Sequence, residues 1–392
     1  MNKTLEKWEE KTIKQLTTLI CDGDWIESKN QSSSGIRLIQ TGNVGDGYYK
    51  DKPENARYIS EDTFKKLNCT EIFSGDCLVS RLPEPLGRAC LIPDRKERMI
   101  TAVDCSIIRF NDKMIVPKYF IYYSMSNLYH TKIINLSTGA TRQRISRKNL
   151  ETITIPVPKN EEQQRIVGIL DEAFENIEKA KQNALQNLNN AKELFESCLD
   201  ELFTKNTNNW NKYKVKDLCE YAKEQGHYNL PYVGMEHVKS SAAEFIGTLD
   251  NTEVKSTTFH FDKGIILYGR LRPYLRKVIL TTFEGHCSTE LFPIKVNDKV
   301  NNKFLMYWLL SQRITDKINA TWTGARMPRA NMNKVLEFDI SIPSIMEQQK
   351  IVVQLDELQE QTKKLEQIYE QKIKDLDELK QSILQKAFNG EL

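Results

Sequence analysis

Apolar residues recur at alternating spacings of four and three along two long stretches of the chain. The periodic positions of the first stretch are Ile166, Leu170, Ala173, Ile177, Ala180, Ala184, Asn187, Ala191, Leu194 and Cys198. Those of the second stretch are Ile351, Leu355, Leu358, Thr362, Leu365, Tyr369, Lys372, Leu376, Leu379 and Ile383. A seven-residue repeat sustained over more than four heptads is typical of a helix that packs along its length. The pattern therefore predicts two long helical segments, 159–204 and 345–392, each of about 45 residues.

The two helical seams differ in the size of their side chains. The first is rich in alanine, whereas the second carries leucine and tyrosine. Because large and small side chains on facing positions fill space together, we expect the two helices to pack on each other within one chain. The alternative is that the seams bind a second copy of the chain.

The regions before the two helical segments show a different pattern. Short runs of β-branched and aromatic residues alternate with Gly, Asn, Asp and Pro, which is typical of strands joined by turns. The clearest runs are IRLIQ, CLVSRL and CSIIRF in the first region and GIILYGRL, KVILTTF and LFPIKV in the second. One helix per region is expected, over 117–135 and 302–319. We therefore expect an α/β protein in which two mixed α/β domains, 1–158 and 205–344, are separated by the two long helices.

The chain repeats itself at a spacing of 185 residues. PKNEEQQRIVGILDE at 158–172 and PSIMEQQKIVVQLDE at 343–357 are identical at nine of fifteen positions. The same spacing aligns STGATRQR at 137–144 with WTGARMPR at 322–329. Self-similarity at a fixed period indicates an internal duplication. The two halves are thus expected to be related by a pseudo-twofold, with similar helices and divergent domains.

Charge separates the domains from the helices. The chain has a net formal charge of +3, but the charge is +5 over 1–158 and +6 over 205–344, against −5 over 159–204 and −3 over 345–392. Basic domains suit a polyanion, whereas acidic rods repel one and suit a protein partner. The division favours nucleic acid as the ligand of the domains, although long solvated helices are often rich in glutamate for solubility alone.

The composition is that of a globular protein without export or membrane signals. Hydrophobic residues make up 40% and charged residues 28% of the chain. The start, MNKTLEKWEEKTIKQL, holds no apolar signal-peptide core, and the densest apolar run, FLMYWLL, is too short to span a bilayer. The eight cysteines include no CxxC pair, so neither a zinc ribbon nor a disulfide framework is indicated. We expect a cytoplasmic protein with reduced thiols.

Arginines cluster in stretches of both domains that also carry tyrosine or glycine. GRLRPYLRK at 269–277 places four basic residues around one tyrosine, and two arginines follow each of the repeated threonine–glycine loops. Arginine suits phosphate contact and bidentate reading of guanine, and glycine allows a close approach of the backbone. The alternative is that each arginine pairs with a nearby acidic residue. The predicted DNA-binding residues are Arg81, Arg88, Arg142, Arg144, Arg270, Arg272, Arg276, Lys277, Arg326 and Arg329.

Catalytic and cofactor motifs are weak or missing in the sequence. NLPY at 229–232 departs from the Asn/Asp-Pro-Pro-Tyr motif of amino-methyltransferases, because leucine replaces the first proline. GNVGDG at 42–47 has the wrong glycine spacing for a dinucleotide site, and no GxxxxGK(S/T) motif predicts ATP binding. No metal-ligand spacing is present among His227, His237, His260 and His286. We therefore expect no catalytic residue, cofactor or metal; a DNA methyltransferase in its own right is the less favoured alternative.

The plan of the chain resembles the specificity subunit of type I restriction–modification systems. The resemblance rests on two domains that each precede a long helix, the proline-led EQQ(R/K)IV helix starts, the TG loops at 138–139 and 323–324, and the terminal KAFNGEL. In that family each domain reads one half of a split DNA target. The helices form an antiparallel coiled coil that sets the gap between the half-sites and docks two methyltransferase (modification) subunits, which restriction subunits then join.

The resemblance implies a non-catalytic subunit with double-stranded DNA, two modification subunits and, through the complex, restriction subunits as partners. The expected docking residues are Glu162, Gln163, Gln164, Glu347, Gln348 and Gln349. They lie at helix starts, where glutamate also interacts favourably with the positive end of the helix dipole, so capping is the alternative role. We further expect Ala180 and Ala184 to be buried where the helices meet. A function of another class, a coiled-coil adaptor whose domains bind protein, is the second candidate.

Overall fold

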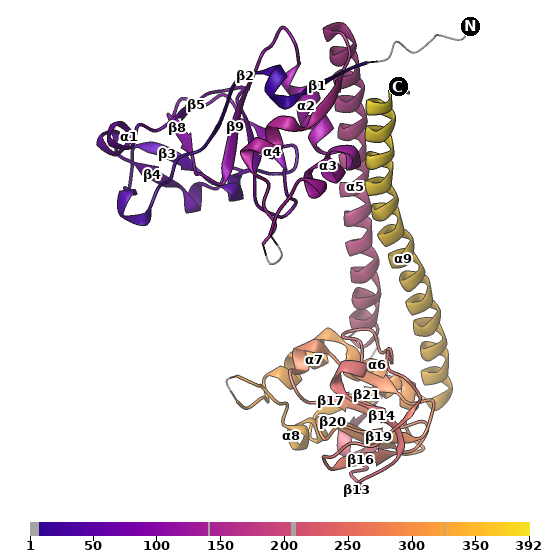
Figure 1. Cartoon of the computed structure of the whole chain (residues 1–392). Helices are drawn as coiled ribbons and strands as arrows, with labels where there is room; N and C mark the ends of the chain where they lie inside the picture. Colours follow the sequence, from indigo (N-terminus) through magenta and orange to yellow (C-terminus); the bar gives the residue numbers. More distant parts are fainter. Residues whose placement is uncertain (1–7, 140–141, 205–208, 325) are drawn as a thin grey trace, which may run out of the picture. The chain divides into compact units, whose positions relative to one another are not determined.

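The chain forms two compact units, and each unit combines one of the expected domains with a part of both long helices. The computed structural model describes residues 8–139, 142–204, 209–324 and 326–392 (Figure 1). Unit 1 consists of Met1–Asn183 and Lys372–Leu392, and unit 2 consists of Ala184–Gln371. Within the described residues, no helix combines the length and apolar character needed to cross a membrane.

Unit 1 contains two four-stranded sheets that include the apolar runs expected to be strands. The first has the order β2-β9-β6-β7 and is antiparallel. The second has the order β4-β3-β8-β5, and its two central strands are parallel. The strands of the first sheet are β2 (Thr17–Asp22), β9 (Cys105–Phe110), β6 (Cys77–Ser80) and β7 (Ala89–Leu91). Those of the second are β4 (Arg57–Ile59), β3 (Ile36–Ile39), β8 (Met99–Thr101) and β5 (Glu71–Ile72).

Unit 2 repeats this arrangement of strands. Its antiparallel sheet has the order β12-β20-β17-β18, and its mixed sheet has the order β13-β16-β19-β14-β15 with β14 and β19 parallel. The strands of the first sheet are β12 (Cys219–Tyr221), β20 (Leu291–Val296), β17 (Ile266–Gly269) and β18 (Val278–Leu280). Those of the second are β13 (Gln225–Gly226), β16 (Thr258–Phe261), β19 (Gly285–Cys287), β14 (Leu230–Val233) and β15 (Asn251–Thr252).

A pair of short helices replaces the single helix expected in each domain. The four helices are α2 (Pro117–Ser124), α3 (Asn127–Asn135), α6 (Asn302–Leu310) and α7 (Gln312–Asn319). The hydroxyl of Ser126 accepts a hydrogen bond from the N–H of Tyr129 at 3.3 Å, and Ser311 has the extended backbone of a helix cap. Serine at these positions starts a second helix instead of continuing the first. Three more short helices were not expected: α1 (Glu61–Leu67), α4 (Arg147–Thr152) and α8 (Met332–Leu336).

A two-stranded antiparallel ribbon leads into each long helix. β10 pairs with β1 before the first helix, and β21 pairs with β11 before the second. The ribbons consist of β1 (Glu9–Thr12), β10 (Thr154–Val157), β11 (Asn211–Lys214) and β21 (Asp339–Ile342). The helices are α5 (Asn160–Leu202) and α9 (Ile345–Asn389), of 43 and 45 residues. Both long helices are therefore confirmed.

The helices α5 and α9 pack together, and their contacts within unit 1 run in opposite directions. The guanidinium of Arg165, near the start of α5, donates to the carbonyl of Leu392 at 2.8 Å. Further along α5, the ammonium of Lys181 pairs with the carboxylate of Asp377 at 2.6 Å. Within this unit, residues later in α5 thus contact residues earlier in α9.

The strict heptad seam expected for α5 is confirmed as far as Ala191, which is buried, except at Asn187, and it is wrong at the later position Leu194. Ala184 is buried as expected and Ala180 is half-buried, but the expected seam positions Asn187 and Leu194 are exposed, Leu194 by 46%. Phe195 is buried instead. A straight helix has 3.6 residues per turn and drifts by about 20° per heptad, so its buried side moves off a seven-residue repeat within a few turns.

The same shift occurs along α9. Thr362 is 3% exposed, as the heptad pattern requires of a seam residue. The later seam positions Leu365 and Leu379 are 38% and 46% exposed, while Leu384 is fully buried one position after the expected Ile383. The sequence therefore identified both helices correctly but placed part of their apolar side one residue too early.

The C-terminal part of each long helix enters the hydrophobic core of a domain. In unit 1, the ring of Phe388 at the end of α9 packs edge-on against Tyr119 and Tyr123, with centroids 5.2 and 5.1 Å apart. In unit 2, Phe195 of α5 packs against Tyr307 at 6.2 Å, and Leu199 is buried in the same core. The core of unit 1 thus includes side chains from a helix that lies far away in the sequence, whereas the core of unit 2 includes side chains from the helix that directly precedes the domain.

Candidate nucleic-acid interface

The two domains contain loops that are closed by the same backbone hydrogen bonds at corresponding positions. In the first, the backbone N–H and carbonyl of Thr138 bond to those of Arg144, both at 2.9 Å. In the second, Thr323 and Arg329 form the same pair of bonds at 3.0 Å. We call the segments 138–144 and 323–329 the TG loops; residues 140–141 and 325 lie outside the described residues.

The glycine of each TG loop adopts a backbone conformation that other residues rarely take. Gly139 has φ +103° and Gly324 has φ +93°. A Cβ atom on Gly139 would lie 2.4 Å from the carbonyl oxygen of Arg142, which is far too close for any real contact. The TG sequence is therefore needed for the turn itself.

In unit 2, the TG loop packs directly on the arginine-rich segment 269–277. The N–H of Arg272 donates to the carbonyl of Pro328 at 2.8 Å, and the N–H of Ala330 donates to the carbonyl of Arg270 at 2.8 Å. Two stretches that the sequence analysis selected separately thus form one continuous surface. The side chains exposed on it are Arg272, Tyr274, Trp322, Arg326 and Met327.

The backbone around Tyr274 is strained in a way that supports a functional role for this surface. Arg272 has φ +50° and Arg276 has φ +48°, on either side of a short 3-10 helix, Pro273–Leu275. A left-handed conformation costs an ordinary residue about 1–2 kcal/mol. Strain of this kind persists where surrounding contacts impose it, and it is concentrated at binding sites.

In unit 1, the corresponding loop lies beside Arg81. The N–H of Ile145, next to the loop, donates to the carbonyl of Arg81 at 3.3 Å, which matches the contact of Ala330 with Arg270 in unit 2. Arg142 is exposed and forms no ion pair with any residue that the structure describes. Arg144 is also exposed, and it pairs with Asp104 at 2.9 Å.

One carboxylate holds two of the predicted arginines in unit 2. Glu290 pairs with Arg270 at 3.0 Å and with Arg329 at 2.8 Å. Burial raises the pKa of Glu290, but the hydrogen bonds from Arg329 and Arg270 outweigh it, so the pKa lies below its usual range. The same carboxylate raises the pKa of Arg329. Both arginines remain partly exposed, so the carboxylate orients them and leaves some of their donors available.

Three of the predicted DNA-binding arginines lie inside the protein. Arg81, Arg88 and Arg276 are 5%, 7% and 7% exposed. Their positions in the interior correct the expectation that they face a ligand. Lys277 is only half-buried, but its ammonium donates to the carbonyl of Met235.

Each buried arginine connects separate segments of its own unit through hydrogen bonds or ion pairs. The Arg88 guanidinium donates to four backbone carbonyls, including those of Thr41 and Val44 at 2.8 and 2.7 Å, and burial lowers its pKa. Arg81 pairs with Asp22 at 3.0 Å. Arg276 bonds to Ser241 at 2.9 Å and pairs with Glu196 of α5. These residues build the domain that presents the TG loop.

The two glutamines of each EQQ motif lie in different environments. The side chains of Gln163 and Gln348 are fully buried. They cannot form a docking surface, which corrects that part of the expectation. Gln164, Glu347 and Gln349 are exposed. Glu162 is half-buried and pairs with Arg165 at 2.6 Å.

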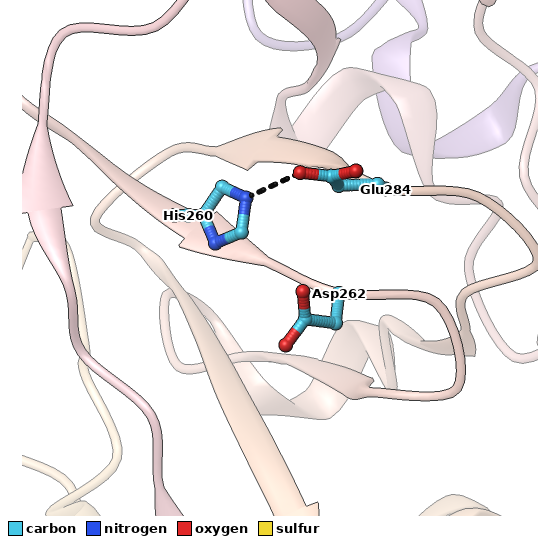
Figure 2. Close-up of side chains that lie close together, drawn as sticks. All are labelled: His260, Asp262 and Glu284. Carbon is cyan, nitrogen blue, oxygen red and sulfur yellow. Dashed lines mark hydrogen bonds and ion pairs between the residues drawn. The ribbon is translucent and has the colours of Figure 1, made fainter.

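Two features of unit 2 were not predicted from the sequence. Trp322, directly before the TG loop, and Met327 within it each expose 48% of their surface. Their large apolar side chains near glycine are the signal that could have identified them. The second feature is a cluster of His260, Asp262 and Glu284, whose donor atoms lie within 4.8 Å of one another (Figure 2). His260 and Asp262 are two residues apart, but Glu284 lies too far along the sequence for a spacing motif to reveal the cluster.

Comparison with known proteins identifies matches over nearly the whole chain. A family model described as "Type I restriction modification DNA specificity domain" matches twice, over residues 5–187 and 192–375. The type I restriction enzyme EcoDI specificity subunit of Escherichia coli is 31% identical over 191 residues, which are 47% of this chain. The match spans only 43% of the length of that subunit.

Two solved structures share the fold. A chain from a study of complex assembly and conformational transition of the type I R-M system has a TM-score of 0.80 at 17% identity, with 100% of both chains covered. The HsdS subunit from Thermoanaerobacter tengcongensis has a TM-score of 0.62 at 18% identity, with 99% of this chain and 98% of that chain covered. At such identities the likeness is one of fold.

Proposed function

The chain belongs to the family of type I restriction–modification DNA specificity domains, of which it carries two, and from this premise we propose that it is the DNA-recognition subunit of such a system. Each domain reads one half of a split target in double-stranded DNA. The subunit itself is non-catalytic, and its reading of DNA requires no cofactor. The observation that carries the proposal is the matched pair of TG loops, each closed by a threonine–arginine backbone pair in its own domain.

The surface around the TG loop of unit 2 has the chemistry that a DNA groove requires. Arg272 and Arg326 can contact phosphates or guanine edges, while Tyr274 and Trp322 can pack against sugars or the methyl groups of thymine. In unit 1, Arg142 and Arg144 supply the corresponding positive charge. The net charges of +5 and +6 on the expected domains attract DNA over longer distances.

The long helices are proposed to act as spacer and docking surface. An antiparallel coiled coil of α5 and α9, related to itself by the internal duplication, would set the distance between two readers of successive major-groove faces, about 34 Å per helical turn of DNA. Two modification subunits would dock on the acidic helices, and restriction subunits would join through them. Of the expected docking residues, the half-buried or exposed members are Glu162, Gln164, Glu347 and Gln349.

Transplanting residues 205–344 into a related specificity subunit tests the reading of one half-site by one domain. The hybrid is expressed with its modification subunit, and methylated positions are mapped in genomic DNA. We expect the second half-site to change to that of the donor and the first to persist. A change in both half-sites, or in neither, would contradict the proposal.

Docking has a separate test. Reversing the charge of several exposed acidic residues along both helices should weaken co-purification with the modification subunit, because the helices carry net charges of −5 and −3. Undiminished co-purification would rule out the helices as the docking surface. The rival function is a protein-binding adaptor that does not bind DNA. It predicts no steep dependence on salt on a heparin column or in a DNA gel shift, whereas phosphate contacts require one.

A further inference from the structure

A second site lies in unit 2, on the mixed sheet. His260 belongs to β16, Asp262 follows this strand directly, and Glu284 precedes β19, which pairs with β16. Figure 2 shows the three side chains gathered at the edge of the paired strands. The Nε2 atom of His260 lies 3.0 Å from a carboxylate oxygen of Glu284. Antiparallel pairing thus brings Glu284 to His260 and Asp262, which are already close in the sequence.

The cluster carries more negative charge than its surroundings neutralise. On the other side of the imidazole, a carboxylate oxygen of Glu224 lies 4.0 Å from Nδ1 of His260. Among the residues that the structure describes, no lysine or arginine forms an ion pair with Glu224, Asp262 or Glu284. Three carboxylates around one imidazole are an environment that favours a cation.

The geometry points to a site for a divalent transition-metal ion, and we propose Zn²⁺ as its ligand, bound by Nε2 of His260 and one carboxylate oxygen each of Asp262 and Glu284. Imidazole favours zinc and related ions over Mg²⁺ and Ca²⁺, which prefer oxygen ligands alone. Glu224 would accept a hydrogen bond from Nδ1 and fix the orientation of the ring. Water completes the coordination.

The distances allow this site after small movements of side chains. Zinc–ligand distances near 2.0–2.1 Å in a tetrahedron place donors about 3.3 Å apart. The donors here lie within 4.8 Å of one another, and Asp262 and Glu284 are exposed. Because exposed carboxylates can change rotamer without disturbing the core, they can close the remaining gap.

Metal binding would connect the two ends of the segment 262–284. This segment contains β17, β18 and the strained turn that carries Arg272 and Tyr274. An ion held by both ends would restrict the opening of this segment. Because the ligands are assembled only in the folded chain, the ion would also stabilise it by mass action. The site therefore adds a metal dependence to the domain that carries the second TG loop.

Calorimetric titration of the chelator-treated full chain with ZnCl₂ tests the proposal. We expect one ion per chain, and no saturable binding of MgCl₂ at the same concentrations. Single substitutions His260→Gln, Asp262→Asn and Glu284→Gln should each raise the Kd for Zn²⁺ at least tenfold. His227→Gln, at an exposed histidine outside the cluster, should leave the Kd unchanged.

A thermal melt with and without Zn²⁺ separates lost binding from lost folding. The three variants should melt at the temperature of the metal-free parent, and only the parent and His227→Gln should gain stability when zinc is added. No saturable zinc binding, or binding that the cluster substitutions leave unchanged, would overturn the proposal and leave His260 and Glu284 as a simple hydrogen-bonded pair.

Discussion

The side-chain oxygen of Gln163 accepts a hydrogen bond from the backbone N–H of Val116 at 2.8 Å, which fastens the start of α5 to the residue before α2. The amide nitrogen of Gln163 donates to the carbonyl of Pro158 at 2.9 Å. In unit 2, Gln348 repeats both bonds, to Asn301 at 2.7 Å and to Pro343 at 2.9 Å. The first glutamine of each EQQ motif therefore joins a long helix to its domain.

Replacing either buried glutamine with alanine should destabilise its unit. Gln163→Ala and Gln348→Ala each leave a partly buried backbone N–H and a buried carbonyl without their partner. Such a loss costs about 1–3 kcal/mol. Urea denaturation measures the loss. Gln164→Ala and Gln349→Ala are matched controls, because these exposed neighbours should change stability by less than about 0.5 kcal/mol. An equal loss of stability at the first and the second glutamine of a motif would contradict the assignment.

Single arginine substitutions in the TG loops should affect different half-sites. Arg326→Ala should impair recognition of one half-site and Arg142→Ala the other, because each exposed arginine lies in its own domain. A lost base contact costs about 1–3 kcal/mol and relaxes specificity at one position, whereas a lost phosphate contact weakens all sequences alike. Methylation mapping, together with DNA binding measured at several salt concentrations, distinguishes a lost base contact from a lost phosphate contact. Lys334→Ala, an equal charge change on α8, should leave both half-sites intact.

Stability should depend on pH through Glu290. Its pKa is lower in the folded chain than in the unfolded one, so it stabilises the fold above the ordinary glutamate pKa of about 4.3, and this contribution is lost as pH falls through the lower folded value. Glu290→Gln should therefore be less stable than the parent at pH 7, by up to about 1 kcal/mol for a partly exposed pair.

The difference should shrink as pH falls from 7 to below the ordinary glutamate pKa, because the parent carboxylate becomes protonated as pH passes through its lower folded pKa. Urea denaturation of both proteins across this range measures it. Glu220→Gln, at an exposed glutamate of β12 without an ion pair among the described residues, should show no such trend. A constant difference at all pH values would mean that Glu290 contributes through shape alone.

The two TG glycines should differ in their tolerance of alanine. Gly139→Ala brings a Cβ atom to 2.4 Å from the Arg142 carbonyl, whereas at Gly324 the nearest atom, the Met327 carbonyl oxygen, is 3.3 Å away. Both substitutions incur the left-handed backbone cost of about 1–2 kcal/mol, and Gly139→Ala should cost more. Gly168→Ala, in the open middle of α5, should instead stabilise by about 1 kcal/mol. Thermal denaturation compares the stability of the three variants.

Adjacent substitutions in α5 should reveal the shifted seam. Phe195→Ala removes a buried ring and should cost about 3–5 kcal/mol, whereas Leu194→Ala, at a 46% exposed position, should cost less than about 1 kcal/mol. The strict heptad pattern predicts the reverse order. Chemical denaturation of the two variants decides between them.

The sequence by itself determined the two long helices, several of the strands and the repeat of short motifs. Alternating spacings of three and four identified α5 and α9, and short apolar runs identified strands such as β6 and β17, because these signals reflect local periodicity. The repeat of 185 residues also located the matched TG loops and the matched EQQ starts, since duplicated segments keep their spacing.

The tertiary structure alone decided what each charged or polar side chain does. Arg88 and Arg272 look alike in the sequence, yet one binds backbone carbonyls inside unit 1 and the other faces solvent in unit 2. Gln163 and Gln164 are neighbours, yet only the first is buried. Burial and partners depend on contacts between distant segments. For the same reason, no local pattern could predict that strand pairing brings His260 to Glu284.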